Sequence, residues 1–340
     1  EIVPDAYDIL EAEVGLYQPW ETWWDEQQCK ADGIYLGAGT YSYGGEVKIR
    51  KPDSVPLYYH FIQLRKKALD TVMERLPGDP GALVCSISYG YKGDLSDQLK
   101  ENFRVAGIYH LLAVSGLHVG LVAQAFWGLL LMLKVNRRLA AVLAAGAVVF
   151  FMALTGFSPS VMRAGIMCVV YFGGLALRRE ADSLNSLGFA LLVMTVASPF
   201  AAGDVGLLLS AGSTGGLLLI LPGFNKLLVS ALCVTFAATL PTLPILAVVM
   251  RRISLAAPLC NLLAVFPASV MMAMGCLVLP LSFSPFAGPL IRGLLFLAGI
   301  IARYLTGLVN LVASWEFAAV SVNELYVVRW ILAELPVLYA

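Results

Sequence analysis

The sequence has little charge and no net charge. Asp, Glu, Lys and Arg make up 14% of the 340 residues, and 23 basic residues balance 23 acidic ones. Ordinary soluble domains carry about 25% charged residues, and a free-standing nucleic-acid-binding domain is usually strongly basic. The composition therefore argues against both classes.

Motifs for nucleotides, metals and redox cofactors are also missing. The sequence contains no P-loop, GxGxxG, HExxH or Cys/His metal spacing, and it has only three histidines. We therefore expect no cofactor, no metal site and no catalytic residue set.

Of the six cysteines, only Cys29 and Cys85 lie in the polar part of the chain. The sequence leaves open whether they pair, which would require an oxidising compartment.

Long apolar runs are abundant instead. Hydrophobic residues make up 59% of the chain, its mean hydropathy is +0.77, and the charges concentrate before residue 108. A membrane-spanning helix needs about 20 apolar residues, and eight stretches approach or exceed that length. They are 108–133, 139–156, 160–177, 184–202, 205–221, 226–250, 254–283 and 286–314. A ninth begins after about 322 and is cut off, which predicts that the chain is a piece of a longer protein.

The basic residues between these stretches predict the orientation. They are Lys134, Arg137, Arg138, Arg178 and Arg179. They follow the first and third stretches, so the positive-inside rule places both loops in the cytoplasm and residues 1–107 outside. Simple alternation then puts Arg251 and Arg252 on the wrong side, which predicts that 205–221 or 226–250 is broken or re-entrant. The residues that would interrupt a helix there are Gly212–Gly216 and Pro241–Pro244. Irregular backbone at membrane depth occurs only where it packs against protein or faces a water-filled cavity.

The first 107 residues divide into two parts. Residues 1–56 read as β-structure, with a hairpin predicted between 33–43 and 46–50. Residues 57–107 read as amphipathic helices, at 57–76 and 94–107. The first helix either lies in the membrane interface or packs on the β-domain, and the sequence leaves both open. Residues 108–340 are predicted to form the transmembrane domain.

The densest group of polar residues within the apolar runs is HLLAVSGLHVG, residues 110–120. If this segment is one helix, His110, Ser115 and His118 share a face. Gly116 would allow another segment to approach the backbone of this helix closely. Three interpretations remain open: a metal or nucleophile site, a hydrogen-bonded knot between helices, or the lining of a hydrated path.

Other polar groups lie within the apolar runs. Arg163 follows a helix start at Ser158–Pro159 and either snorkels to the interface or lies on a substrate path. Asp204, Ser210 and Thr214 surround the glycine-rich stretch, and Asn261 lies in a later run.

HLLAVSGLHVG resembles the signature of the ComEC competence family. SPSVMRAG (158–165), LRREADSLNSLGFALLVMTVASPF (177–200) and MRRISLAAPLCNLLAVF (250–266) are similar to further elements of that family, in the family's order. One element departs from the pattern. Where the family has Asp-Pro-Gly-Phe-Gln-Leu-Ser, this chain has DVGLLLS (204–210), so Leu208 replaces the usual Gln.

The resemblance implies a mainly α, polytopic transmembrane helical bundle in the bacterial cytoplasmic (inner) membrane. It would carry single-stranded DNA into the cytoplasm during natural transformation. Residues 1–56 then resemble the end of an extracytoplasmic OB-like β-domain. The expected partners are single-stranded DNA, the lipid bilayer and other competence proteins, including a DNA receptor and a cytoplasmic helicase-type ATPase, and a homo-oligomer stays open. A nuclease domain, found in many members, would lie outside this chain, which we expect not to be an enzyme.

The predicted DNA path and a predicted phosphate-collecting surface complete the hypothesis. The path residues are His110, Ser115, Gly116, His118, Arg163, Asp204, Ser210, Thr214 and Asn261. The phosphate-collecting residues are Lys48, Arg50, Lys51, Arg65, Lys66 and Lys67. Two alternatives from other classes remain: a transporter for a smaller solute that uses the same broken helices, and an intramembrane hydrolase built on Ser115 with a histidine.

Overall fold

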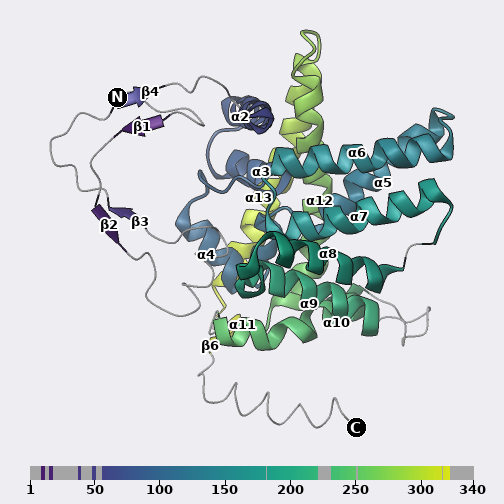
Figure 1. Ribbon diagram of the computed structural model, residues 1–340. Helices are drawn as coiled ribbons and strands as arrows, with labels where there is room; N and C mark the ends of the chain where they lie inside the picture. The colour runs from purple at the N-terminus through teal and green to yellow at the C-terminus, as the bar shows by residue number, and fades with distance from the viewer. Residues whose placement is uncertain are drawn as a thin grey trace, which may run out of the picture.

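A computed structural model describes residues 9–11, 15–17, 37–39, 48–50, 56–180, 182–220, 231–249, 252–315 and 317–321. The predicted ninth apolar stretch, Cys29 and Lys51 lie outside the described residues. Figure 1 shows a mainly helical molecule, in which several long helices pack side by side. The predicted fold class, a polytopic helical membrane protein, is confirmed by this architecture.

The described strands of the N-terminal part are short and pair over long distances in the sequence. Strand β1 (Ile9–Glu11) pairs antiparallel with β4 (Lys48–Arg50), and β2 (Gly15–Tyr17) pairs antiparallel with β3 (Gly37–Gly39). The predicted hairpin between 33–43 and 46–50 is therefore wrong, because β3 and β4 each pair with an earlier strand instead of with each other.

Three helices connect this part to the membrane domain. They are α2 (Leu57–Arg75), α3 (Asp79–Tyr89) and α4 (Asp97–Val105). The predicted amphipathic helices correspond to α2 and α4. Helix α2 buries Ala68 and Val72 and packs on α3, α6 and α12. Its apolar face is thus covered by the helices of the membrane domain.

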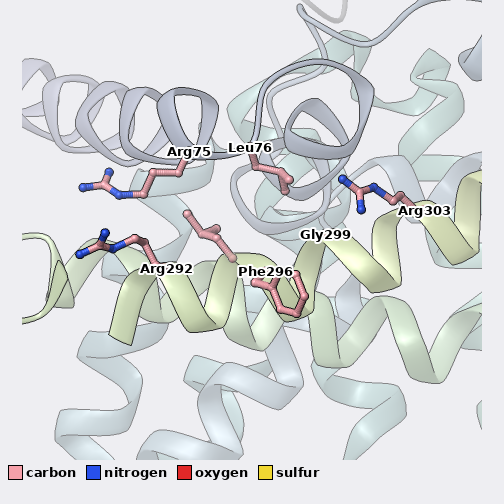
Figure 2. A pocket seen from close by; sticks show the side chains of 7 residues that line it. Arg75, Leu76, Arg292, Phe296, Gly299 and Arg303 are labelled. Atoms are coloured by element: carbon pink, nitrogen blue, oxygen red, sulfur yellow. The ribbon is translucent and has the colours of Figure 1, made fainter. Parts of the chain in front are cut away.

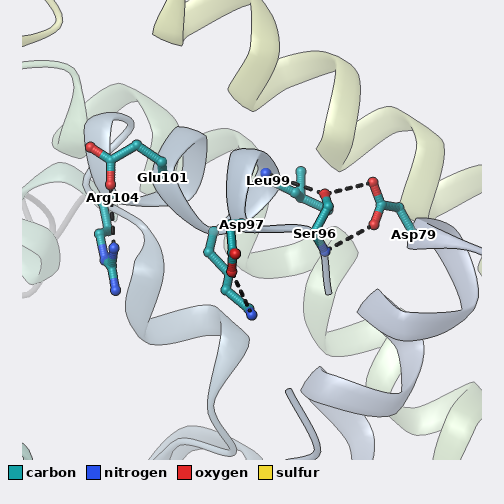
Figure 3. A network of polar contacts seen from close by, with 7 residues as sticks. Asp79, Ser96, Asp97, Leu99, Glu101 and Arg104 are labelled. Atoms are coloured by element: carbon teal, nitrogen blue, oxygen red, sulfur yellow. Dashed lines mark hydrogen bonds and ion pairs between the residues drawn. The ribbon is translucent and has the colours of Figure 1, made fainter. Parts of the chain in front are cut away.

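Helix α4 is fixed to the start of α3 by a short polar network. The Ser96 hydroxyl caps α4 by accepting a hydrogen bond from the Leu99 N–H at 3.4 Å. The same hydroxyl donates to Asp79 Oδ2 at 2.9 Å, and the Ser96 N–H donates to Asp79 Oδ1 at 3.2 Å, as Figure 3 shows. One serine therefore ties the N-termini of two helices together.

Helix α3, which was not predicted, is the most buried helix of this part. Every residue from Gly81 to Tyr89 is buried, and Tyr89 donates a hydrogen bond to the Gly275 carbonyl at 2.6 Å. Burial raises the pKa of the Cys85 thiol in this helix to about 12. Cys85 is a free thiol, and Cys29, with which the sequence left a pairing open, lies outside the described residues.

The central helices are η1 (Tyr109–Leu112), α5 (Gly116–Met132), α6 (Arg137–Thr155) and α7 (Pro159–Leu177). Helices α5, α6 and α7 pack on one another through a cluster of small and medium apolar side chains, among them Val119, Ala144 and Val148. Ser158 and Pro159 begin α7 as predicted.

The next layer is built from shorter pieces. They are α8 (Ser183–Ala197), η2 (Pro199–Gly203), α9 (Val205–Ile220), α10 (Ala231–Thr239), η4 (Leu240–Thr242) and α11 (Leu243–Val249). Within 226–250, a 3-10 turn that contains the predicted breaker Pro241 separates α10 from α11. The glycine-rich stretch does not break α9, contrary to the prediction. Gly216 instead permits close packing, since a Cβ there would collide with the Ala237 carbonyl oxygen.

The last two helices, α12 (Ala257–Leu281) and α13 (Gly288–Ala313), form an antiparallel pair flanked by β5 (Arg252–Ser254) and β6 (Ala319–Ser321). They enclose the largest apolar core together with α3 and α4. Within the described residues, α6, α7, α12 and α13 are long and apolar enough to cross a membrane. In Figure 1, α12 and α13 run steeply across the direction of α6 and α7.

Candidate functional site

The signature segment HLLAVSGLHVG is not one helix. The 3-10 turn η1 ends at Leu112, Ala113 is extended (φ −110°, ψ 149°), and α5 begins after Ser115, which is also extended. The Ser115 N–H donates to His118 Nδ1 at 3.3 Å, so the histidine stabilises the start of the helix. The prediction that His110, Ser115 and His118 share a helix face is therefore wrong. The chain turns between them because Ser115 and Gly116 form a helix N-terminus.

The two histidines have different surroundings. His118 is fully buried, whereas the side chain of His110 is exposed. Because His118 Nδ1 accepts a hydrogen bond, a neutral imidazole carries its proton on Nε2. This Nε2 is buried and has no hydrogen-bond partner in the part of the chain that the structure describes. A buried donor without an acceptor is energetically costly.

A buried arginine lies at the centre of the site. Arg163 is only 5% exposed, so snorkelling to the interface is wrong as an explanation for it. Its Nε donates to the Ser210 hydroxyl at 2.9 Å, and its Nη1 donates to the Thr214 hydroxyl. The Ser160 hydroxyl lies 3.1 Å from that of Ser210. The arginine of α7 is thus held by neutral hydroxyl groups of α9.

The start of α5 lies against the same guanidinium group. A Cβ built on Gly116 would lie 2.9 Å from Arg163 Nη2, so only glycine fits without displacing the arginine. The N-terminus of a helix carries free N–H groups and the positive end of the helix dipole. Within the described residues no carboxylate forms an ion pair with Arg163. Among the described residues, the guanidinium group and the helix N-terminus thus place positive potential together without an ion-paired carboxylate, which suits an anion.

Asp204 and Asn261, like the exposed His110, lie outside this cluster of contacts. Asp204 is buried and caps α9, because its carboxylate accepts from the Leu207 N–H. Leu208, which replaces the family's usual Gln, is partly buried on the first turns of α9. Asn261 lies near the start of α12, and its Oδ1 is buried without a partner among the described residues. The structure thus joins Gly116, Arg163, Ser210 and Thr214 of the predicted path.

Of the predicted phosphate-collecting residues, the three on α2 do not share one surface. Lys66 and Lys67 of α2 are exposed, and Lys67 Nζ lies 3.8 Å from the centre of the Phe283 ring. Arg65 turns inward toward α3 and α6, where its guanidinium lies 5.9 Å from the Tyr91 ring centre. Burial lowers the pKa of Arg65. Lys48 and Arg50 lie on β4, where only the backbone is described.

Sequence reasoning omitted Ser160 from the predicted path. Ser160 and Arg163 are three residues apart on α7, and Ser210 and Thr214 are four apart on α9. Residues at these spacings lie on the same face of a helix. A search for polar pairs at helical spacing within apolar stretches would have found Ser160.

We expect the His118 side chain to contribute to stability through its contact with the Ser115 N–H. Replacement His118→Ala should lower the free energy of unfolding by about 1 kcal/mol, the usual effect of removing a cap. His118→Gln should recover part of it, because the amide oxygen can accept the same hydrogen bond. Thermal unfolding of the detergent-purified protein measures both. Equal midpoints for wild type and His118→Ala would contradict the capping role.

Comparison with known proteins identifies the family. The family model described as "Competence protein" matches residues 87–340. The chain is 28% identical over 210 residues to ComE operon protein 3 of Bacillus subtilis, covering 61% of this chain and 27% of that protein. It is 31% identical over 248 residues to competence protein ComA of Neisseria gonorrhoeae, covering 70% of this chain and 35% of that protein. No solved structure matches the chain.

The chain spans about a quarter to a third of the length of these two relatives. The family match includes the signature segment, Arg163 and the hydroxyl residues of α9, so the residues that form the site belong to the matched region. The ordered motifs, the apolar helices and the family model agree. The chain therefore belongs to the competence protein family, and it is a membrane protein of the ComEC type.

Proposed function

We propose that this chain forms part of the path by which a DNA-uptake protein conducts a single DNA strand across the cytoplasmic membrane. One observation carries the proposal. Arg163 is buried between α5, α7 and α9, contacts hydroxyl groups instead of carboxylates, and presents Nη2 toward the N-terminus of α5. A guanidinium group next to a helix N-terminus is suited to a phosphate group.

The hydroxyl groups that contact Arg163 are suited to a site past which a DNA strand moves. Ser160, Ser210 and Thr214 are neutral, so they orient Arg163 without neutralising it. A carboxylate in their place would pair with the arginine and compete with a phosphate. A single charged contact also holds each phosphate less tightly than a cluster of cations would, which suits passage from one nucleotide to the next. These features favour DNA conduction over a tight anion-binding site.

The proposal gives the chain no catalytic step. A serine nucleophile requires a base within hydrogen-bond reach, and His118 Nδ1 is occupied by the Ser115 N–H instead of the Ser115 hydroxyl. Among the described residues, no group of three His, Cys, Asp or Glu side chains is placed to hold a metal ion. We propose that strand degradation, if the whole protein performs it, takes place in another region.

We propose the same partners that the family resemblance implies: single-stranded DNA, a DNA receptor outside and a cytoplasmic helicase-type ATPase.

The proposal also places residues 1–107 on the extracytoplasmic side. The supporting observation is the group of basic residues around the start of α6 and the end of α7, where Arg137, Arg138 and Arg178 line a common pocket of about 510 Å³. Such clusters mark the cytoplasmic side of membrane proteins.

Site-specific crosslinking tests the path. A photo-reactive amino acid at Gly120 of the full-length protein lies one helical turn from Gly116 on the same face, where an added side chain meets nothing within 4 Å. We expect labelled DNA to crosslink there during uptake. Gly188 of α8 is the matched control, because it is exposed and equally open and lies on a helix whose described residues make none of the Arg163 contacts given above.

Crosslinking at Gly120 with none at Gly188 would support a DNA path along α5. Absence of DNA at Gly120, in cells that still transform, would contradict the proposal and favour a smaller solute at this site. Equal labelling at both positions would show that DNA contact is not confined to the path.

A further inference from the structure

Three arginines from two helices surround a second pocket, distant in sequence from the proposed DNA path. The pocket has a volume of about 280 Å³ and lies between the end of α2 and the outer face of α13. Its lining residues are Arg75, Leu76, Arg292, Leu295, Phe296, Gly299 and Arg303. Figure 2 shows the guanidinium groups of Arg75 and Arg292 side by side at one end, with Arg303 at the other.

Regular spacing on α13 builds this pocket. Arg292, Leu295, Gly299 and Arg303 follow one another at intervals of three and four residues, so they lie in one stripe along the helix. Leu76, the residue that follows α2, packs against the stripe at Gly299, where a Cβ would lie 3.0 Å from the leucine Cδ1. The glycine therefore allows α2 to approach, and the arginines remain on either side of this contact.

The arginines at this pocket have few acceptors. Arg75 Nη1 donates to the Thr71 carbonyl at 3.1 Å and lies 3.9 Å from the carboxylate of Glu74, which is largely exposed. Arg292 and Arg303 have no hydrogen bond or ion pair in the described part of the chain. No carboxylate lines the pocket. Neighbouring cations repel one another, and an anion between Arg75 and Arg292 would relieve that repulsion.

The surroundings indicate what the anion is. Leu76, Leu295 and Phe296 give the pocket an apolar wall, and Phe296 is 67% exposed on a helix long enough to cross a membrane. Arg292 is near the N-terminal end of that helix, whereas Arg303 lies about 16 Å further along its axis, at 1.5 Å per residue. A phosphate held at the helix end, with apolar surface leading away from it, matches a phospholipid.

We propose that the Arg75–Arg292 end of this pocket binds the phosphate of an anionic phospholipid, whose acyl chain lies along Phe296. Arginine suits this role because its planar fork donates two hydrogen bonds to one phosphate. The bound lipid joins α2 to α13 and so fixes the amphipathic helix against the membrane domain. A nucleic acid is less suited to the pocket, because the wall around it is apolar and exposes only one aromatic ring.

Native mass spectrometry of the delipidated full-length protein tests the proposal. The probes are phosphatidylglycerol and phosphatidylcholine, and the variant is Arg75→Gln with Arg292→Gln. We expect the double variant to bind phosphatidylglycerol at least about tenfold more weakly, the effect of losing charge-assisted hydrogen bonds. Phosphatidylcholine carries the same phosphate but also a choline cation that the arginines repel, so its binding should fall much less. Arg292→Lys should show an intermediate loss, because it keeps the charge without the fork.

The matched control is Lys100→Gln with Arg104→Gln on α4, which removes the same charge from residues paired with Asp97 and Glu101. It should leave lipid binding unchanged. Equal binding of phosphatidylglycerol by wild type and the Arg75/Arg292 variant would overturn the proposal. If a thymidine oligonucleotide displaces the lipid, and the variant loses oligonucleotide binding to the same extent, the pocket serves a nucleic-acid phosphate and the lipid assignment is wrong.

Discussion

Replacement of Arg163 by Gln should reduce transformation by the full-length protein by roughly 10- to 100-fold. Hydrogen bonds to a charged group contribute about 1.5–3 kcal/mol, and each 1.4 kcal/mol is a factor of ten. Gln can still donate to one hydroxyl of α9 but carries no charge for a phosphate. Transformation frequency measures the loss, and the amount of protein in the membrane shows whether the variant folds and inserts.

Arg163→Lys should retain part of the activity. Lysine keeps the positive charge but cannot donate to Ser210 and Thr214 while also facing Gly116, because these contacts use three different nitrogens of the guanidinium group. Arg179→Gln is the matched control, since Arg179 lies just beyond the end of the same helix and is exposed. It should transform normally.

Gly116→Ala tests the same site without removing a polar group. The added methyl group would lie 2.9 Å from Arg163 Nη2 and 3.3 Å from the Ala164 Cβ, so the guanidinium must move. We expect reduced transformation with normal membrane insertion. If Arg163→Gln and Gly116→Ala both transform at the wild-type frequency, this cluster is a packing contact between helices and does not lie on the DNA path.

Gly275→Ala should destabilise the protein strongly. A Cβ at Gly275 would collide with the Ser88 hydroxyl and would lie 2.8 Å from the Ser88 Cβ, in the contact between α12 and α3. The Ser88 hydroxyl can rotate, but the two Cβ atoms can separate only if the helices move apart. Overpacking of a buried contact typically costs about 1–3 kcal/mol. The shift would also disturb the hydrogen bond from Tyr89 to the Gly275 carbonyl.

A compensating pair separates this steric effect from an intrinsic need for glycine. Ser88→Gly removes the atoms that collide, so the double variant Ser88→Gly with Gly275→Ala should unfold at a higher temperature than Gly275→Ala alone. Gly307→Ala on α13 is the control, because a side chain there meets nothing within 4 Å. It should be neutral or slightly stabilising. Equal unfolding temperatures for wild type and Gly275→Ala would show that the two helices separate at little cost.

Helix positions were largely predictable from the sequence, because they depend on local patterns. The apolar stretches gave the helices of the membrane domain, and Ser158–Pro159 gave the start of α7. The interruption at Leu240–Thr242 followed from its proline and from the unequal distribution of basic residues. The break between η1 and α5 was missed, because an apolar segment with helical spacing gives no sign of where the chain turns.

The candidate site was predictable in its members but not in its geometry. Arg163, Ser210 and Thr214 were singled out as polar groups in apolar surroundings, and such groups are costly there unless they meet partners. Their contact joins residues 47 and 51 positions apart. Which face of α7 meets which face of α9 depends on packing, and neither helix encodes that alone. The inward position of Arg65 could not be predicted either, because it also depends on how helices pack.

The sequence by itself determined that this protein is built from apolar helices for a membrane, and which polar groups those helices carry. Helix formation and lipid burial depend on residues within a few turns of one another, so they can be read along the chain. The tertiary structure alone decided that α3 is buried, that α5 begins against Arg163, and that Arg75 and Arg292 meet between α2 and α13. These features arise where distant segments pack, because the space left beside each glycine determines how closely two helices approach.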